Sequence, residues 1–199
     1  EMIITDATFP LANIDTEAVL GLVATAEVET EVEVDQDVRL EDRAQGTLRP
    51  PPNFMPGDIS LTCWIEKWGF KDATGFVEPR VLISVRNLDG EPLGALQETP
   101  VCVQRTHNYC HFDSTVYIQM SLNQLPKGTA VFFEFRHWKA RKHKKSTWAY
   151  CFMEMDEIKS GPVTLEVYKK PADYSRKQTP SLLTVKPLYM HLDLAVKRI

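Results

Sequence analysis

The fold of this chain is decided by residues 131–155, which read VFFEFRHWKARKHKKSTWAYCFMEM. Two apolar, aromatic-rich runs at 131–135 and 147–155 flank a short basic stretch, as the strands of a hairpin in a packed sheet do. Between Arg136 and Lys145 there are six Lys or Arg residues, two His and no acid. This pattern predicts a rigid hairpin whose cationic loop binds an anionic partner.

Similar strand signals recur at short spacing along the rest of the chain. Alternating or β-rich runs predict strands at 59–68, 80–88, 101–106, 115–122, 163–168 and 188–194, besides those of the hairpin at 130–137 and 147–155. Asp89-Gly90 marks a tight turn. Because no long amphipathic helix separates these eight strands, they predict an all-β fold, an antiparallel sandwich.

The N-terminal part of the chain differs in charge from the remainder. Residues 1–50 carry twelve Asp or Glu and three Arg, a net charge of −9. Residues 51–199 carry fifteen Asp or Glu and twenty Lys or Arg, a net charge of +5, so the whole chain has a net charge of −4. Asp15 is a candidate cap for a short helix at 16–26, and residues 27–38 alternate acids with Val, which fits either an edge strand or an extended chain. We predict an acidic, partly extended tail at 1–46, ordered by a protein partner, and a folded domain at 47–199.

The stretch LRPPPNFMPGD at 48–58 predicts a stiff linker, with regular structure beginning near Gly57. No apolar run reaches the ~18 residues that a transmembrane helix needs. The cysteines at 63, 102, 110 and 151 form no CxxC pair, and we expect reduced thiols in a cytoplasmic protein.

The sequence offers little for catalysis or for metal binding. It contains no GxSxG, no HExxH and no Gly-rich phosphate loop, so we expect neither an enzyme nor a cofactor. Calcium requires clustered oxygen ligands, for which Asp72 and Glu78 are the candidates at one end of the sandwich. The loop at 136–146, which should face them, has no carboxylate, so we expect no bound metal.

The basic hairpin has several interpretations. Each Lys or Arg near an anionic phospholipid surface contributes ~1 kcal/mol, and a Trp is favoured at the membrane interface. An acidic protein surface, including the chain's own tail, and a solvated loop are the alternatives, whereas the modest net charge argues against nucleic acid. The candidate lipid-binding residues are Arg136, Trp138, Lys139, Arg141, Lys142, Lys144 and Lys145, with a second basic cluster at Lys169 and Lys170.

Five segments are distinctive: IEKWGFKD at 65–72, VFFEFRH at 131–137, CFMEMDEI at 151–158, LEVYKKP at 165–171 and KPLYMHL at 186–192. In this order and spacing, between about Thr47 and Leu194, they resemble the Aida-type C2 domain family. The resemblance implies an eight-stranded antiparallel C2 sandwich whose loops at one end meet membranes. Glu78-Pro79-Arg80 stands where calcium-binding C2 domains have Asp-Pro-Tyr, and the basic run stands where their third loop has acids. The calcium-type positions Asp72 and Glu78 are therefore expected to be vestigial.

Charge and resemblance together predict a non-catalytic, calcium-independent C2 module that binds phosphoinositide membranes as part of an adaptor or scaffold protein. Such a protein would be cytoplasmic and peripheral to the membrane. The alternative is a protein–protein docking or structural module in a larger signalling, cytoskeletal or ciliary assembly. Fold alone does not distinguish between the two.

Overall fold

The computed structural model describes residues 45–199, so the predictions on Asp15, the helix at 16–26 and the alternation at 27–38 lie outside the described residues.

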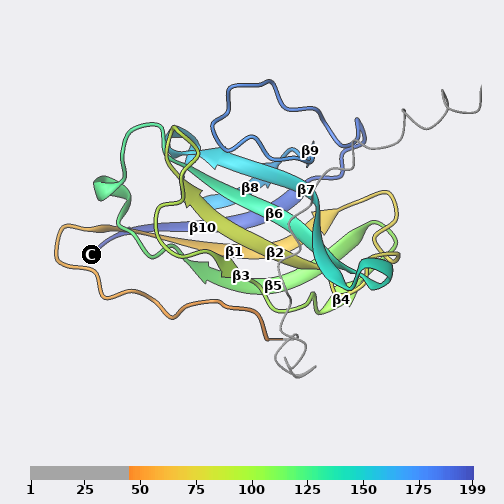
Figure 1. The fold of residues 1–199 in the computed structure, drawn as a ribbon. Helices are drawn as coiled ribbons and strands as arrows, with labels where there is room; N and C mark the ends of the chain where they lie inside the picture. Colours follow the sequence, from red (N-terminus) through yellow and green to blue (C-terminus); the bar gives the residue numbers. More distant parts are fainter. Residues whose placement is uncertain (1–44) are drawn as a thin grey trace, which may run out of the picture. The chain divides into compact units, whose positions relative to one another are not determined.

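Residues 45–199 form a sandwich of two five-stranded sheets (Figure 1). One sheet has the order β4-β5-β1-β10-β8 and the other β3-β2-β6-β7-β9, and their strand pairs are antiparallel. The strands are β1 (Ile59–Gly69), β2 (Arg80–Arg86), β3 (Gln97–Glu98), β4 (Gln104–Arg105), β5 (Tyr109–Tyr117), β6 (Ala130–Lys139), β7 (Lys144–Glu154), β8 (Gly161–Leu165), β9 (Tyr168–Lys169) and β10 (Met190–Arg198), with 3-10 turns η1 (Leu122–Gln124), η2 (Ala140–Lys142) and η3 (Met155–Glu157).

The predicted all-β antiparallel sandwich is confirmed, but residues 45–199 contain ten strands and not eight. The two strands that sequence reasoning missed, β3 and β9, have two residues each, too few to show a periodicity. The strand expected at 115–122 lies at 109–117. Its start was predicted too late, because Asp113 and Ser114 interrupt the alternation of apolar residues in the sequence. Asp113 has a φ of 46° and lies where the register between β1 and β5 shifts. Within residues 45–199 no helix is long and apolar enough to cross a membrane.

Aromatic rings cluster in the core at the end of the sandwich that carries the basic hairpin. Phe135 of β6 is fully buried, and its ring centroid lies 4.3 Å from that of Phe70 and 4.7 Å from that of Phe76. Trp68 packs edge-on against the same ring at 5.6 Å. Aromatic pairs at these distances contribute ~1 kcal/mol each beyond the area that they bury. The segment at 70–76 is thereby fixed beneath the end of β6.

The basic stretch is more ordered than the predicted loop at 136–146. Strand pairing continues from Arg136↔Thr147 to Lys139↔Lys144, so β6 and β7 extend far into it. The connection is η2 and then His143, whose φ of 47° places it in the left-handed region. Figure 1 shows the paired strands continuing to the tip of a curled hairpin. Backbone pairing therefore holds the cations in a defined arrangement.

The proline-rich linker is also more ordered than expected, since its first residues dock on the sandwich before Gly57. The backbone N–H of Thr47 donates to the carbonyl of Glu98 at 2.7 Å, and the N–H of Glu98 donates to Thr47 Oγ1 at 2.9 Å. Leu48 packs against the core. This strap, residues 46–50, borders β3 and then continues toward β1 (Figure 1). The boundary between residues 46 and 47 stays a prediction.

Gly46 should be required for docking of the strap. It has a φ of 68°, and a Cβ built on it would lie 2.5 Å from the carbonyl oxygen of Glu98. We expect Gly46→Ala to lower the free energy of unfolding by about 2 kcal/mol, from backbone strain and this clash. Urea unfolding measures the loss.

Gly57→Ala is the matched control, because Gly57 has a φ of 97° but no atom within 4 Å of an added Cβ. Its loss should be about 1 kcal/mol, from backbone strain alone. Equal losses for the two variants would mean that the strap does not approach β3 closely.

Candidate functional site

The base of the basic hairpin is fastened to the loop that joins β1 and β2. The backbone N–H of Trp138 donates to the carbonyl of Val77 at 2.8 Å. The ring of Phe76 lies 5.2 Å from that of His137 and 5.7 Å from that of Trp148. The Arg105 guanidinium holds the same loop from the other sheet, because it donates to the carbonyls of Thr74 and Phe76. Loop and hairpin therefore form one rigid end of the sandwich.

One buried carboxylate organises the cations at the base of the hairpin. Glu98 on β3 has only 7% of its side chain exposed and accepts from Lys145 Nζ and, at 3.3 Å, from Arg136 Nη1. Arg80 Nη1 lies 3.9 Å from the same carboxylate, and the Arg80 side chain is 2% exposed. A buried cation costs several kcal/mol unless it is paired. Glu98 therefore compensates charges from three neighbouring strands.

The predicted lipid-binding residues consequently differ in their surroundings. Arg136 and Lys145 at the base are paired with Glu98 inside the protein. Lys139, Arg141 and Lys142 lie at the tip, where Arg141 and Lys142 are exposed and Lys139 is half-buried. Two further predicted residues are held differently: Trp138 is half-buried at the base, and Lys144 is exposed but has contacts of its own.

The second predicted basic cluster lies beside the hairpin. Lys169 on β9 is paired with Ala149 on β7, and Lys170 follows it. Burial, together with the charges of Lys139 and Lys170, lowers the pKa of His137, which places both lysines near this ring. Lys169 and Lys170 therefore extend the cationic surface from the hairpin toward β9.

Sequence reasoning missed the exposed apolar side chains that accompany these cations. Trp148 is 40% exposed and Val77 is 47% exposed. In β7 the register shifts between Thr147, paired with Arg136, and Ala149, paired with Phe135, so Trp148 is the extra residue of a β-bulge. Bulges redirect side chains, and this one places Trp148 at a shallow pocket of about 290 Å³ with Phe70 and Phe76. The sequence signal for this site was a second Trp three residues after the end of the basic run at Lys145.

The vestigial calcium-type positions are used for other contacts. Asp72 accepts a hydrogen bond of 2.7 Å from Thr74 Oγ1, which, with backbone N–H groups, lowers the pKa of its carboxyl. Glu78 Oε2 lies 3.9 Å from Arg80 Nη2. Among residues 45–199 no group of three or more His, Cys, Asp or Glu side chains could hold a metal ion. Calcium takes six to eight oxygens, so this donor set does not fit it.

Replacing Glu98 should reveal how strongly it holds the hairpin base. We expect Glu98→Gln to lower the free energy of unfolding by about 3 kcal/mol, because the variant removes one of the two carboxylates beside the buried Arg80 and the charge that pairs Arg136 and Lys145. The exposed Glu91→Gln is the control and should change stability by less than ~0.5 kcal/mol. Chemical denaturation at neutral pH measures both, and similar stabilities would show that Glu98 does not compensate Arg80.

Comparisons with known proteins agree with this architecture. Residues 48–194 match the family model described as "Axin interactor dorsalisation-associated protein, C-terminal", an Aida-type C2 family. The chain is 48% identical over 151 residues to the axin interactor, dorsalization-associated protein of Danio rerio, covering 76% of this chain and 50% of that protein. For the Homo sapiens protein the identity is 47% over 150 residues, covering 75% and 49%.

A solved C2 domain of plant extended synaptotagmin 1 is similar with a TM-score of 0.47 and 14% identity, over 73% of this chain and 98% of that chain. The chain spans about half the length of the relatives that it matches. The match of the family model covers most of the sandwich, from the strap to β10. The chain therefore belongs to the Aida-type C2 family, the C-terminal domain of the axin interactor, dorsalization-associated proteins.

Proposed function

We propose that this C2 domain is a non-catalytic module that docks its parent protein on anionic phospholipid membranes, phosphoinositides included, without calcium. The single observation that carries the proposal is the tip of the hairpin. Lys139, Arg141 and Lys142 stand there on a rigid base, and the partly exposed side chains of Trp148 and Val77 lie at that base. Cations attract the phosphate head groups, and apolar side chains enter the interface beneath them.

The energies favour the tip over the base of the hairpin. Each Lys or Arg close to an anionic surface contributes ~1 kcal/mol, so the three tip residues supply ~3 kcal/mol. Arg136 and Lys145 supply less, because their charges are already balanced by Glu98. No calcium enters this scheme, since fixed cations attract the lipid directly. A cytoplasmic protein that is peripheral to the membrane fits this mode of binding.

The second candidate function is docking to another protein. The relatives are named as interactors of axin, and this name supports a role as an adaptor or scaffold. An acidic partner surface would use the same cations as a membrane does. Residues 1–46 remain the predicted segment for a second protein partner.

Reversing the charges of the tip should abolish membrane binding. We expect the triple variant Lys139→Glu, Arg141→Glu, Lys142→Glu to bind phosphoinositide-containing vesicles at least about a hundredfold more weakly, from the loss of ~3 kcal/mol. Vesicle co-sedimentation measures this, and binding by the original chain should weaken between about 0.1 M and 0.5 M salt. Addition of a calcium chelator should have no effect.

The control applies the same charge change at the opposite end of the sandwich. Lys127, Lys197 and Arg198 are exposed, and Lys127 precedes the start of β6 while the other two end β10. Their triple Glu variant should retain membrane binding. Equal losses in both variants would indicate attraction by net charge alone, and undiminished binding by the tip variant would reject the tip as the membrane site. Failure of the original chain to bind the vesicles would reject the membrane proposal in favour of protein docking.

A further inference from the structure

Two of the four cysteines meet where β4 joins β5. The backbone N–H of Val103 donates to the carbonyl of His111 at 2.8 Å, and Arg105 is paired with Cys110. At this junction the thiols of Cys102 and Cys110 lie close enough for each to shift the pKa of the other. Cys110 is fully buried, and its sulfur also lies 3.8 Å from the carbonyl of Ala73. The pair is therefore set between an edge of the sheet and the core.

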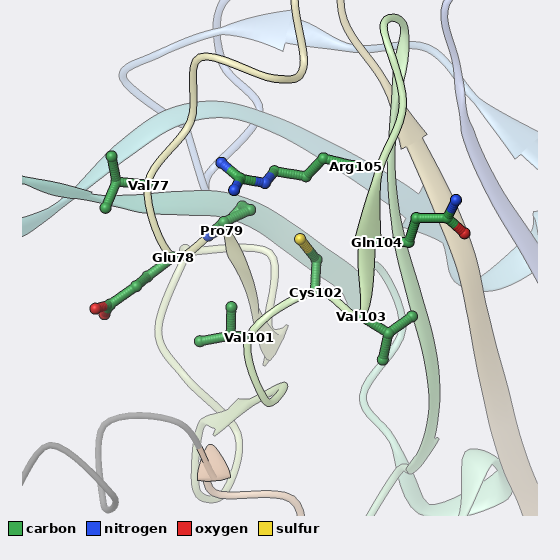
Figure 2. A pocket seen from close by; sticks show the side chains of 8 residues that line it. All are labelled: Val77, Glu78, Pro79, Val101, Cys102, Val103, Gln104 and Arg105. Atoms are coloured by element: carbon green, nitrogen blue, oxygen red, sulfur yellow. The ribbon is translucent and has the colours of Figure 1, made fainter.

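Cys102 is half-buried and lines an open pocket of about 490 Å³. Its backbone N–H donates to the carbonyl of Pro79 at 2.9 Å, which fixes its position. Figure 2 shows the Cys102 sulfur directed to the side of the pocket where the Arg105 side chain lies, while the carboxylate of Glu78 points away. A small solute can thus reach the Cys102 sulfur beside a cation.

The surroundings activate one of these thiols and suppress the others. The hydrogen bond from Cys110 and then the charge of Arg105 lower the pKa of Cys102. The same hydrogen bond and burial raise the pKa of Cys110. Burial raises the pKa of Cys63 to about 12 and that of Cys151 well above its usual value. Because the thiolate is the nucleophile, the accessible cysteine is also the reactive one.

We infer that Cys102 and Cys110 form a peroxide-reactive dithiol site, which takes hydrogen peroxide or another small hydroperoxide and closes to an intramolecular disulfide. The Cys102 thiolate attacks the terminal peroxide oxygen, the O–O bond breaks, and the leaving oxygen takes up a proton. Cys102 is then a sulfenic acid, and the peroxide has been reduced by two electrons. The Cys110 sulfur attacks the Cys102 sulfur, the S–O bond breaks, and hydroxide leaves as water with the Cys110 proton.

This site is independent of the proposed membrane function. It lies on the β4 side of the loop at 70–79, whereas the tip cations lie on the hairpin. Arg105 connects the two regions, since its guanidinium is near Cys102 and also holds the carbonyls of Thr74 and Phe76. The disulfide would tie the segment before β4 to the buried strand β5.

Peptide mapping of the intact 199-residue chain tests this inference. The chain is treated with a small excess of hydrogen peroxide, and the remaining thiols are then alkylated under denaturing conditions. Trypsin cleaves after Arg105, between the two cysteines, so the disulfide is detected as two peptides joined through Cys102 and Cys110. We expect this pair, with Cys63 and Cys151 still alkylated as internal controls.

Two variants assign the roles within the pair. Cys110→Ser should leave a sulfenic acid on Cys102 that dimedone labels, and Cys102→Ser should leave Cys110 reduced. Should Cys110→Ser fail to fold, the original chain and Cys102→Ser decide the question. The inference would be overturned if Cys102 were oxidised no faster than Cys63 or Cys151. It would also be overturned if Cys110 were oxidised in the Cys102→Ser variant.

Discussion

The burial of Glu98 is the constraint on which the hairpin end of this domain depends. Its backbone pairs with Thr47 of the strap, and its carboxylate compensates Arg80, Arg136 and Lys145. The charges of three strands and the docking of the strap therefore meet at a single residue of a two-residue strand. A buried group that satisfies several cations at once is strongly coupled to each of them, because its removal takes this partner from Arg136 and Lys145 and leaves Arg80 beside Glu78, 3.9 Å away.

This constraint explains why the cations of one basic stretch occupy two different environments. The cations at the base have a fixed acidic partner and stabilise the hairpin, whereas Lys139, Arg141 and Lys142 project beyond it. Counting the Lys and Arg residues in the sequence overestimates the proposed anion-binding surface. The count includes cations, such as Arg136 and Lys145, whose charges are neutralised by Glu98 within the fold. The exposed Trp148 and Val77 add apolar area that the count omits.

Most of the fold follows from local pattern, and most of the site does not. Alternation of residues such as Val81, Ile83 and Val85 predicted the long strands, because one face of each is buried. Nothing in the segment around Glu98 indicates a buried acid, since its partners come from residues 80, 136 and 145. The position of Trp148 depends on a bulge, and bulges arise from strand register that a single segment does not contain.

The loop at 70–79 is held at this end of the sandwich by contacts within the protein. In a calcium site the loops carry acids that repel one another until the ion binds. Here Phe76 packs on Phe135, and Arg105 holds the carbonyls of residues 74 and 76, so neutral packing and one cation fix the loop. A surface charged by Lys and Arg keeps its charge at every calcium concentration. Control over such a surface must therefore act through the charge of its partner, the ionic strength or covalent change of the protein itself.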